Sequence, residues 1–218
     1  FSPDGERLFF AREAEGGKSS LFVRPLAIGS EQELHTAEGV MAPLAVTPDG
    51  QRLVFAKLAE GAYDLFALDL ANGNEVAPIT QTKGFAEFRA DLSPDGRWLT
   101  LQSDESGTGE IYVQPFPGPG RRWQLSTGGG FFPVWSRDGS EIFFRDGQGQ
   151  LSHVAVSAGT DFDAGVPEAL FPLAVGIGNS VRKFVVSPDG QRFLAQVPTS
   201  EAGKPISVIV GWDASLPQ

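Results

Sequence analysis

The stretch Leu92-Ser-Pro-Asp-Gly-Arg-Trp-Leu99 decides the fold, because the turn at its centre returns along the chain at nearly constant spacing. Successive turn aspartates, at positions 4, 49, 95, 138 and 189, stand 43 to 51 residues apart. A period of about 45 residues is typical of the four-stranded blades of a β-propeller. The turns are Ser2-Pro3-Asp4-Gly5, Thr47-Pro48-Asp49-Gly50, Ser93-Pro94-Asp95-Gly96, Ser136-Arg137-Asp138-Gly139 and Ser187-Pro188-Asp189-Gly190.

Each turn has the chemistry of a reversal between two strands. Proline pre-sets the backbone angle of the second turn position, a serine or threonine hydroxyl bonds to nearby backbone, and glycine accepts a left-handed conformation. Apolar strands flank the turn, and a third strand follows a polar hairpin. The strand after the turn is expected at 8–10, 53–55, 98–101, 142–144 and 193–195, and the third at 21–23, 65–68, 111–113, 153–156 and 206–210.

The predicted fold class is therefore all-β, a β-propeller arc of about five four-stranded blades. We expect the blades at approximately residues 1–39, 40–84, 85–130, 131–178 and 179–218. Weaker outer strands are expected near 33–35, 76–79 and 123–125, since blade edges tolerate such sequences. The first repeat lacks an inner strand and the last ends after its third, which predicts a fragment of a larger propeller.

Composition and charge exclude several classes of protein. The net charge is −10, and no basic run exceeds Arg121-Arg122, so nucleic acid is not an expected partner. There is no cysteine, which excludes disulfides and thiolate metal sites. No segment approaches about 18 consecutive apolar residues, so no membrane segment is expected in this sequence.

The repeats resemble the TolB-like, PD-type family of β-propeller repeats. From residue 89 onward they resemble more closely the C-terminal propellers of bacterial transmembrane serine/threonine protein kinases. That closer resemblance implies a non-catalytic sensor or interaction domain in an extracytoplasmic, periplasmic location. It rests on Leu92 to Leu99, Ser103-Asp-Glu-Ser-Gly107, Ile111-Tyr-Val-Gln-Pro-Phe-Pro-Gly118, Trp123-Gln-Leu-Ser-Thr-Gly-Gly-Gly130, Trp135-Ser-Arg-Asp-Gly139, Phe184-Val-Val-Ser-Pro-Asp-Gly190 and Pro205-Ile-Ser-Val-Ile-Val-Gly-Trp212.

Signatures of an enzyme are missing from these residues. There is no glycine-rich kinase loop, His-Arg-Asp or Asp-Phe-Gly motif, and no Gly-x-Ser-x-Gly nucleophile elbow. We therefore predict a protein that is not an enzyme by itself. The alternative is the accessory propeller of a prolyl-oligopeptidase-type serine peptidase, whose hydrolase domain would lie outside the sequence. A lactonase-like propeller enzyme is a third reading.

Three sequence features superficially suggest chemistry, and each has a simpler interpretation. Gly16-Gly17-Lys18-Ser19 lacks the first glycine of a phosphate-binding loop and lies between two predicted strands, so we expect a hairpin. Asp161 and Asp163 lack the remaining ligands of a calcium loop and are expected in a solvated loop. His35 and His153 stand in different blades. No catalytic residue, cofactor site or metal site is predicted.

Charged residues interrupt two of the predicted inner strands. Glu87, Arg89 and Asp91 stand in the third repeat, and Arg182 and Lys183 in the fifth. Inner strands border a propeller's channel, so these five residues are a candidate channel or ligand face. The competing interpretation is ion pairing between blades or plain solvation in a wet channel.

The hairpin loops carry an excess of acidic residues. Asp104, Glu105 and Glu110 are the candidate acidic partner face, which would attract a basic protein or ligand. On the same side, the glycine-rich segments 127–130 and 176–178 would let backbone approach a ligand closely. The competing interpretation is that the acidic loops only keep the propeller soluble.

Overall fold

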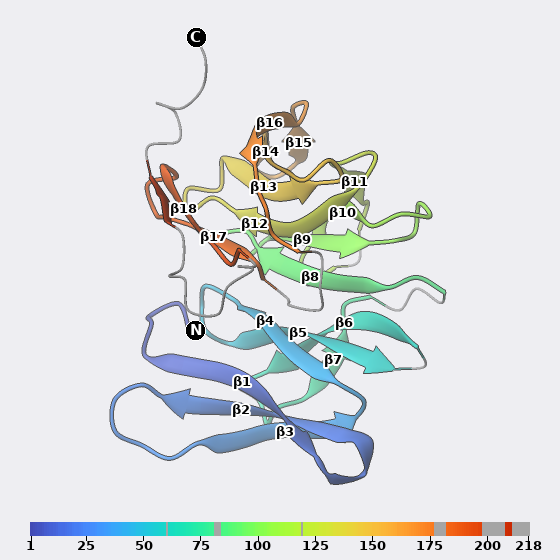
Figure 1. The fold of residues 1–218 in the computed structure, drawn as a ribbon. Helices are drawn as coiled ribbons and strands as arrows, with labels where there is room; N and C mark the ends of the chain where they lie inside the picture. The colour runs from blue at the N-terminus through green and yellow to red at the C-terminus, as the bar shows by residue number, and fades with distance from the viewer. Residues whose placement is uncertain (60, 81–83, 119, 177–181, 198–207, 211–218) are drawn as a thin grey trace.

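The chain forms a series of antiparallel sheets that follow one another in sequence order (Figure 1). The computed structural model describes residues 1–59, 61–80, 84–118, 120–176, 182–197 and 208–210. The helical content of these residues is one short 3-10 turn, Glu15–Gly17. The described part therefore also contains no helix that could cross a membrane.

Five sheets make up the described structure, and neighbouring strands pair antiparallel throughout. In Figure 1 they run from the blue sheet at the bottom to the yellow sheet at the top, with the red sheet at the left. The predicted all-β fold is thus confirmed. The sheets are β1 (Arg7–Ala14), β2 (Lys18–Pro25) and β3 (Gln32–Glu38); β4 (Met41–Val46), β5 (Arg52–Ala59), β6 (Ala62–Asp69) and β7 (Val76–Pro78); β8 (Glu87–Leu92), β9 (Trp98–Ser103), β10 (Glu110–Pro115) and β11 (Trp123–Gln124); β12 (Gly130–Trp135), β13 (Glu141–Asp146), β14 (Gln150–Ala158), β15 (Phe162–Ala164) and β16 (Glu168–Pro172); and β17 (Phe184–Val186), β18 (Arg192–Ala195) and β19 (Val208–Val210).

The repeated turn joins the first two strands of each complete sheet through the same small network. The Ser93 hydroxyl donates to Asp95 Oδ1 at 2.6 Å and accepts the Trp98 N–H at 3.0 Å. Ser93 N–H in turn donates to the Trp98 carbonyl at 2.9 Å. The five turn glycines have φ between +70° and +75°, which glycine adopts without strain. Local chemistry alone therefore specifies these reversals.

Ionisation of the turn aspartates is favoured by the same network. A hydrogen bond from the turn's serine or threonine hydroxyl lowers the pKa of Asp4, Asp49, Asp138 and Asp189. At Asp95, burial raises the pKa, but hydrogen bonds from Ser93 and Arg97 outweigh it and the pKa is lowered there too. These five residues are called the turn aspartates below.

Apolar clusters fill the spaces between successive sheets. Phe9 and Leu21 of the first sheet pack with Phe55 of the second. A further cluster joins the second sheet to the third, another the third to the fourth, and a last one the fourth to the fifth. Interior sheets are therefore buried on both faces, as blades in a propeller are.

Successive turns also touch one another. A Cβ on Gly96 would lie 2.8 Å from Pro48 Cδ of the preceding sheet's turn. A Cβ on Gly139 would lie 3.4 Å from the equivalent atom of Pro94. Gly96 is thus required twice, for its own backbone angle and for the close approach of Pro48.

The expectation of a solvated loop at 161–165 is wrong. Residues Phe162–Ala164 form strand β15, paired with the end of β14. Phe162 is buried, and its ring centroid lies 5.3 Å from that of Trp98 and 5.4 Å from that of Trp123. Burial of this aromatic group between two sheets holds the segment as a strand, because large rings dominate such packing.

Candidate functional site

Asp91 and Arg182 are 91 positions apart in sequence and form an ion pair between the third and fifth sheets. Arg182 Nη2 lies 2.8 Å from Asp91 Oδ1, with the Asp91 side chain mostly buried and that of Arg182 37% exposed. The second carboxylate oxygen, Oδ2, accepts the backbone N–H of Trp135 at 3.0 Å. Asp91, on the first strand of the third sheet, therefore contacts the first strand of the fourth sheet and the residue two positions before β17 in the fifth.

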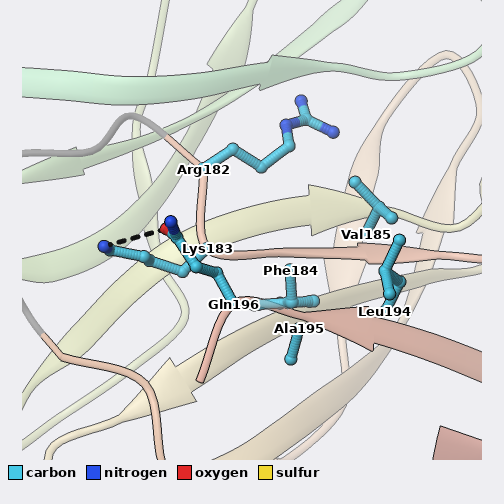
Figure 2. Close-up of a pocket in the computed structure, with 7 residues that line it drawn as sticks. All are labelled: Arg182, Lys183, Phe184, Val185, Leu194, Ala195 and Gln196. Carbon is cyan, nitrogen blue, oxygen red and sulfur yellow. Dashed lines mark hydrogen bonds between the residues drawn. The ribbon is translucent and has the colours of Figure 1, made fainter. Parts of the chain in front are cut away.

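A cavity of about 420 Å³ adjoins this pair, on the two inner strands of the last sheet (Figure 2). Lys183 extends along it, and Lys183 Nζ donates to Gln196 Oε1 at 3.2 Å. Val185 and Leu194 are cross-strand partners that lie together at the other end, each about 40% exposed. Two cationic groups and an amide thus border an apolar surface, an arrangement suited to a ligand with an anionic and an apolar part. The lining residues are Arg182, Lys183, Phe184, Val185, Leu194, Ala195 and Gln196.

Arg89 does not face solvent. Its guanidinium carbon lies 4.4 Å from the ring centroid of Phe88 and 4.3 Å from that of Phe132, and Nη1 donates to Gln102 Oε1 at 2.9 Å. The side chain is buried, which lowers the pKa of Arg89 to about 10. A cation held between two rings is stabilised by both π faces. Arg89 therefore joins the third and fourth sheets and is not available to a ligand.

The bulges of the inner strands place Arg89. Pairing of β8 with β9 shifts register between Phe88 and Asp91, and pairing of β12 with β13 shifts between Phe131 and Val134. Arg89 and Phe132 stand inside these bulges at φ values of +53° and +59°. A bulge re-aims the side chain that it carries, so two equivalent bulges direct the cation and the ring toward each other.

Glu87 is also committed to the interior. It is fully buried, and its Oε1 lies 2.5 Å from Arg122 Nη2. Arg122 pairs in addition with Glu105 Oε2 at 2.6 Å and donates to Gln114 Oε1 at 2.9 Å. One arginine thereby ties the inner strand, the hairpin loop and the third strand of a single sheet together.

The five candidate channel residues are thus divided between two environments. Asp91, Arg182 and Lys183 lie at the cavity or beside it. Glu87 and Arg89 are built into the packing of the third sheet. Ion pairing between sheets, the competing interpretation, describes Asp91 with Arg182, while Lys183 pairs with an amide. Lys183 Nζ is the cation at the cavity for which the described structure shows no carboxylate partner within 4 Å.

The candidate acidic partner face needs correction. Glu110 is buried, with 2% of its surface exposed. Its carboxylate accepts Ser126 Oγ–H at 2.5 Å, the Gly129 N–H at 2.8 Å and Thr108 Oγ1–H at 3.1 Å. Glu110 therefore anchors the glycine-rich segment 127–130 instead of meeting a partner, and that segment is held in place by its own sheet.

Asp104 and Glu105 are each engaged within the chain as well. Asp104 Oδ1 accepts the backbone N–H of Ala86 at 2.7 Å, which fixes the loop that enters β8. Glu105 is neutralised by Arg122. Of the three acids, Glu110 is therefore buried and Glu105 is paired with an arginine, while Asp104 keeps its charge. The glycine-rich segment 176–178 lies outside the described residues except for Gly176.

The other residues that the sequence singled out lie in a hairpin turn or in strands, where they contact neighbouring side chains. Residues 15–17 form the predicted hairpin turn, and Lys18 and Ser19 open strand β2. His153 Nδ1 lies 2.7 Å from Glu141 Oε1, and the imidazole stacks on Phe143. His35 lies near Phe55, where burial and the charge of Lys57 lower its pKa. No cluster of three or more metal-ligating side chains occurs among the described residues.

Sequence reasoning missed two parts of the site. Val185 and Leu194 belong to strands predicted from their apolar character, but their exposure depends on which face of the last sheet is covered. Gln196 follows the strand and gives no signal of its own. Strict alternation along 183–186, with Lys183 and Val185 on one face and Phe184 on the other, could have identified the exposed face.

Comparison with known proteins gives a consistent result. Residues 1–168 match the family model described as the TolB beta propeller domain, PD40. A relative in Agrobacterium fabrum, the uncharacterized protein Atu1656, is 29% identical over 199 residues, which cover 88% of this chain and 66% of that protein.

Solved structures share the fold at lower identity. TolB from Acinetobacter baumannii superposes with a TM-score of 0.68 at 21% identity, covering 92% of this chain and 48% of that one. A TolB candidate from Agrobacterium tumefaciens gives 0.62 at 21% identity, covering 78% and 64%. The chain thus spans less than two thirds of each of these relatives. A prolyl endopeptidase also shares the fold, with a TM-score of 0.54 at 16% identity and 30% of its chain covered.

Proposed function

Because this chain belongs to the TolB β-propeller domain family, we propose that it is a binding module without chemistry of its own. Its ligand in this proposal is a segment of a protein, or a small molecule, that carries a carboxylate next to apolar groups. The site is the cavity bordered by Arg182 and Lys183 at one end and by Val185 and Leu194 at the other. We place the module in an extracytoplasmic, periplasmic location, in keeping with the resemblance to TolB-like proteins.

One observation carries this proposal, the uneven distribution of charge between the two candidate faces. Among the acidic residues that would have attracted a basic partner, Glu110 accepts the buried Gly129 N–H, and Glu105 forms an ion pair with Arg122. At the cavity, Asp91 pairs with Arg182, whereas Lys183 Nζ bonds to the Gln196 amide and has no carboxylate within 4 Å among the described residues. An incoming carboxylate would therefore gain a charge-assisted hydrogen bond from Lys183 while its apolar neighbour covers Val185.

Binding of short peptides tests the proposal. The probes are a capped peptide of alternating leucine and aspartate, the same peptide with asparagine, and the same peptide with lysine. We expect the aspartate peptide to bind most tightly, with an affinity that falls as salt rises because the charges are partly exposed. Isothermal titration at low and at physiological ionic strength measures both effects.

Charge-neutral variants locate the site. Lys183→Gln should weaken binding of the aspartate peptide by about tenfold, the value of one charge-assisted contact of about 1.4 kcal/mol. Lys18→Gln is the matched control, because Lys18 is an exposed lysine on a distant hairpin. Equal affinity for the aspartate, asparagine and lysine peptides, or equal loss in the two variants, would contradict the proposal.

If the module is part of a longer protein, two kinds of parent are candidates. In the first, the module is the sensing part of a serine/threonine kinase-like protein, supported by the sequence resemblance of the second half. In the second, it is the accessory propeller of a prolyl-oligopeptidase-type peptidase, supported by the fold shared with a prolyl endopeptidase. The complete gene separates them, because kinase motifs upstream favour the first and a nucleophile elbow downstream favours the second.

A further inference from the structure

Another cavity, of about 290 Å³, lies between the first and second sheets, the two lowest sheets in Figure 1. One wall comes from strands β1, β2 and β3, and the other comes from the loop that follows β6. It shares no lining residue with the cavity of the last sheet, so the two are separate places on the molecule.

The first sheet presents a row of side chains to this cavity. Phe9 is the cross-strand partner of Val23, and Val23 is that of Gln32, so the three side chains lie in one row on one face of the sheet. Phe9 is buried in the cluster between the first two sheets, and Leu34 and Leu70 pack against that cluster. The wall is therefore mostly apolar, with one amide at its outer end.

Arg7 brings a guanidinium to the same cavity. It precedes Phe9 by two residues on the same face of β1, and its guanidinium carbon lies 5.7 Å from the Phe9 ring centroid. In the part of the chain that the structure describes, other cations form all the ion pairs, and no carboxylate oxygen lies within 4 Å of Arg7. A guanidinium fits a carboxylate through two parallel hydrogen bonds, so Arg7 has donors to offer an anion.

Asp4 is the carboxylate that the charge of Arg7 reaches. A hydrogen bond from the Ser2 hydroxyl is the main cause that lowers the pKa of Asp4, and the charge of Arg7 adds a smaller effect. Asp4 Oδ1 already accepts the Ser2 hydroxyl and the Glu6 N–H, so this carboxylate belongs to its own turn. It does not replace a partner for Arg7 at the cavity.

The turn of the second sheet holds Arg7 at this place. A Cβ on Gly50 would lie 3.4 Å from Arg7 Nη2, whereas the equivalent glycines, Gly96 and Gly139, approach the proline of the preceding turn. Arg7 thus lies between the ring of Phe9 and the next turn. A side chain fixed in this way loses little conformational freedom when it binds a ligand.

The opposite wall is a loop held by its own hydrogen bonds. Asp69 Oδ1 accepts the backbone N–H of Asn72 at 2.9 Å, and Leu70 N–H donates to the Gln51 carbonyl at 2.7 Å. Asn74 follows at φ +59°, and its side chain lines the cavity. The loop therefore supplies a second amide from a preformed backbone.

We propose that this cavity binds a small carboxylate that has an apolar body. The carboxylate lies on the guanidinium of Arg7, with the amides of Gln32 and Asn74 at the border of the cavity as further donors. The body covers the apolar wall around Phe9 and Leu34. Small-molecule sites commonly combine such an apolar lining with a few polar groups that fix the orientation of the ligand. This site goes beyond the proposed function, because it involves other sheets and does not need Lys183.

Three probes of similar shape test the class of ligand: hydrocinnamate, its neutral amide, and the cationic amine phenylpropylamine. In an NMR titration of the full chain, hydrocinnamate should shift the backbone amide signals of Val23, Gln32 and Asn74. It should bind there about tenfold more tightly than the neutral amide, and the amine should bind more weakly than either. Signals of Lys183 and Leu194 report separately on the cavity of the last sheet, so failure of one site is distinguishable from failure of the other.

Side-chain variants locate the binding site. Arg7→Gln should lower the affinity for hydrocinnamate about tenfold at these signals and leave the affinity for the neutral amide unchanged. Arg24→Gln is the matched control, because Arg24 is an exposed arginine of the same sheet whose cross-strand partner, Leu8, lies on the opposite face from Arg7. Asn74→Gly keeps the left-handed backbone and removes the amide, so it should lower the affinity severalfold and tests the site even if Arg7→Gln does not fold. Equal binding of hydrocinnamate and its amide, equal loss in the Arg7 and Arg24 variants, or shifts confined to other residues would overturn the proposal.

Discussion

Glu110 gives the most direct test of how the third sheet is held together. The perturbation is Glu110→Ala, which removes the acceptor of three hydrogen bonds, two of them from groups that are buried, Ser126 and Gly129. A hydrogen bond to a buried carboxylate contributes about 1.5–2 kcal/mol, so two such bonds account for about 3–4 kcal/mol. Thr108 is nearer the surface and can bond to water instead. Against a typical unfolding free energy of about 5–15 kcal/mol, this loss is large.

Equilibrium unfolding in urea, followed by fluorescence of the four tryptophans, measures the change. Glu110→Gln retains one acceptor oxygen for the Gly129 N–H, so it should lose about 1–2 kcal/mol. Glu13→Ala is the matched control, since Glu13 is exposed and its loss should change stability by less than about 0.5 kcal/mol. A loss below about 1 kcal/mol for Glu110→Ala, at an unchanged urea dependence, would refute the argument from buried donors.

Three further predictions concern the turns and one half-buried carboxyl group. Burial, then the charge of Glu87, raises the pKa of Asp64, whose Oδ1 has no hydrogen-bond partner in the described structure, so Asp64→Asn should raise the Tm at pH 7 and have little effect at pH 3. Gly96→Ala should destabilise by about 2–3 kcal/mol, because alanine is strained at φ +71° and its Cβ would meet Pro48; an unchanged urea midpoint would contradict this. The pKa values of the turn aspartates are lowered by folding, so their contribution to stability is complete above their unfolded pKa of about 3.9 and is lost as pH falls further, which a Tm series from pH 7 to pH 2 would detect.

Features determined by local sequence could be predicted. The turn of Ser93 to Gly96 needs only neighbouring side chains and backbone, so its repetition in the sequence predicts five sheets. The apolar segments that flank the turns then predict the paired strands of each sheet. The side chains and backbone groups that form such a turn lie within a few residues of one another, so the turn can be recognised in a single sequence.

Features that depend on distant residues could not be predicted. Glu110 looks like one more acid in a polar hairpin, and only the fold brings Ser126 and Gly129 to its carboxylate. Phe162 stands between two aspartates, and its burial depends on tryptophans from other strands. The charges of the inner strand from Glu87 to Asp91 are visible in the sequence. Their division into packing and cavity residues followed from bulges that periodicity does not reveal.

The contact between the turn of one sheet and that of the next has a consequence for exchange of repeats between proteins. Two turn glycines approach the proline of the preceding repeat: Gly96 lies beside Pro48, and Gly139 lies beside Pro94. A transplanted repeat must therefore bring a glycine for its upstream neighbour and present an acceptable second turn residue to its downstream one. Arg137 occupies that second position in the fourth repeat. A graft placed after this repeat therefore meets a different junction from a graft placed after the second or third repeat, so the repeats of this chain are not freely interchangeable.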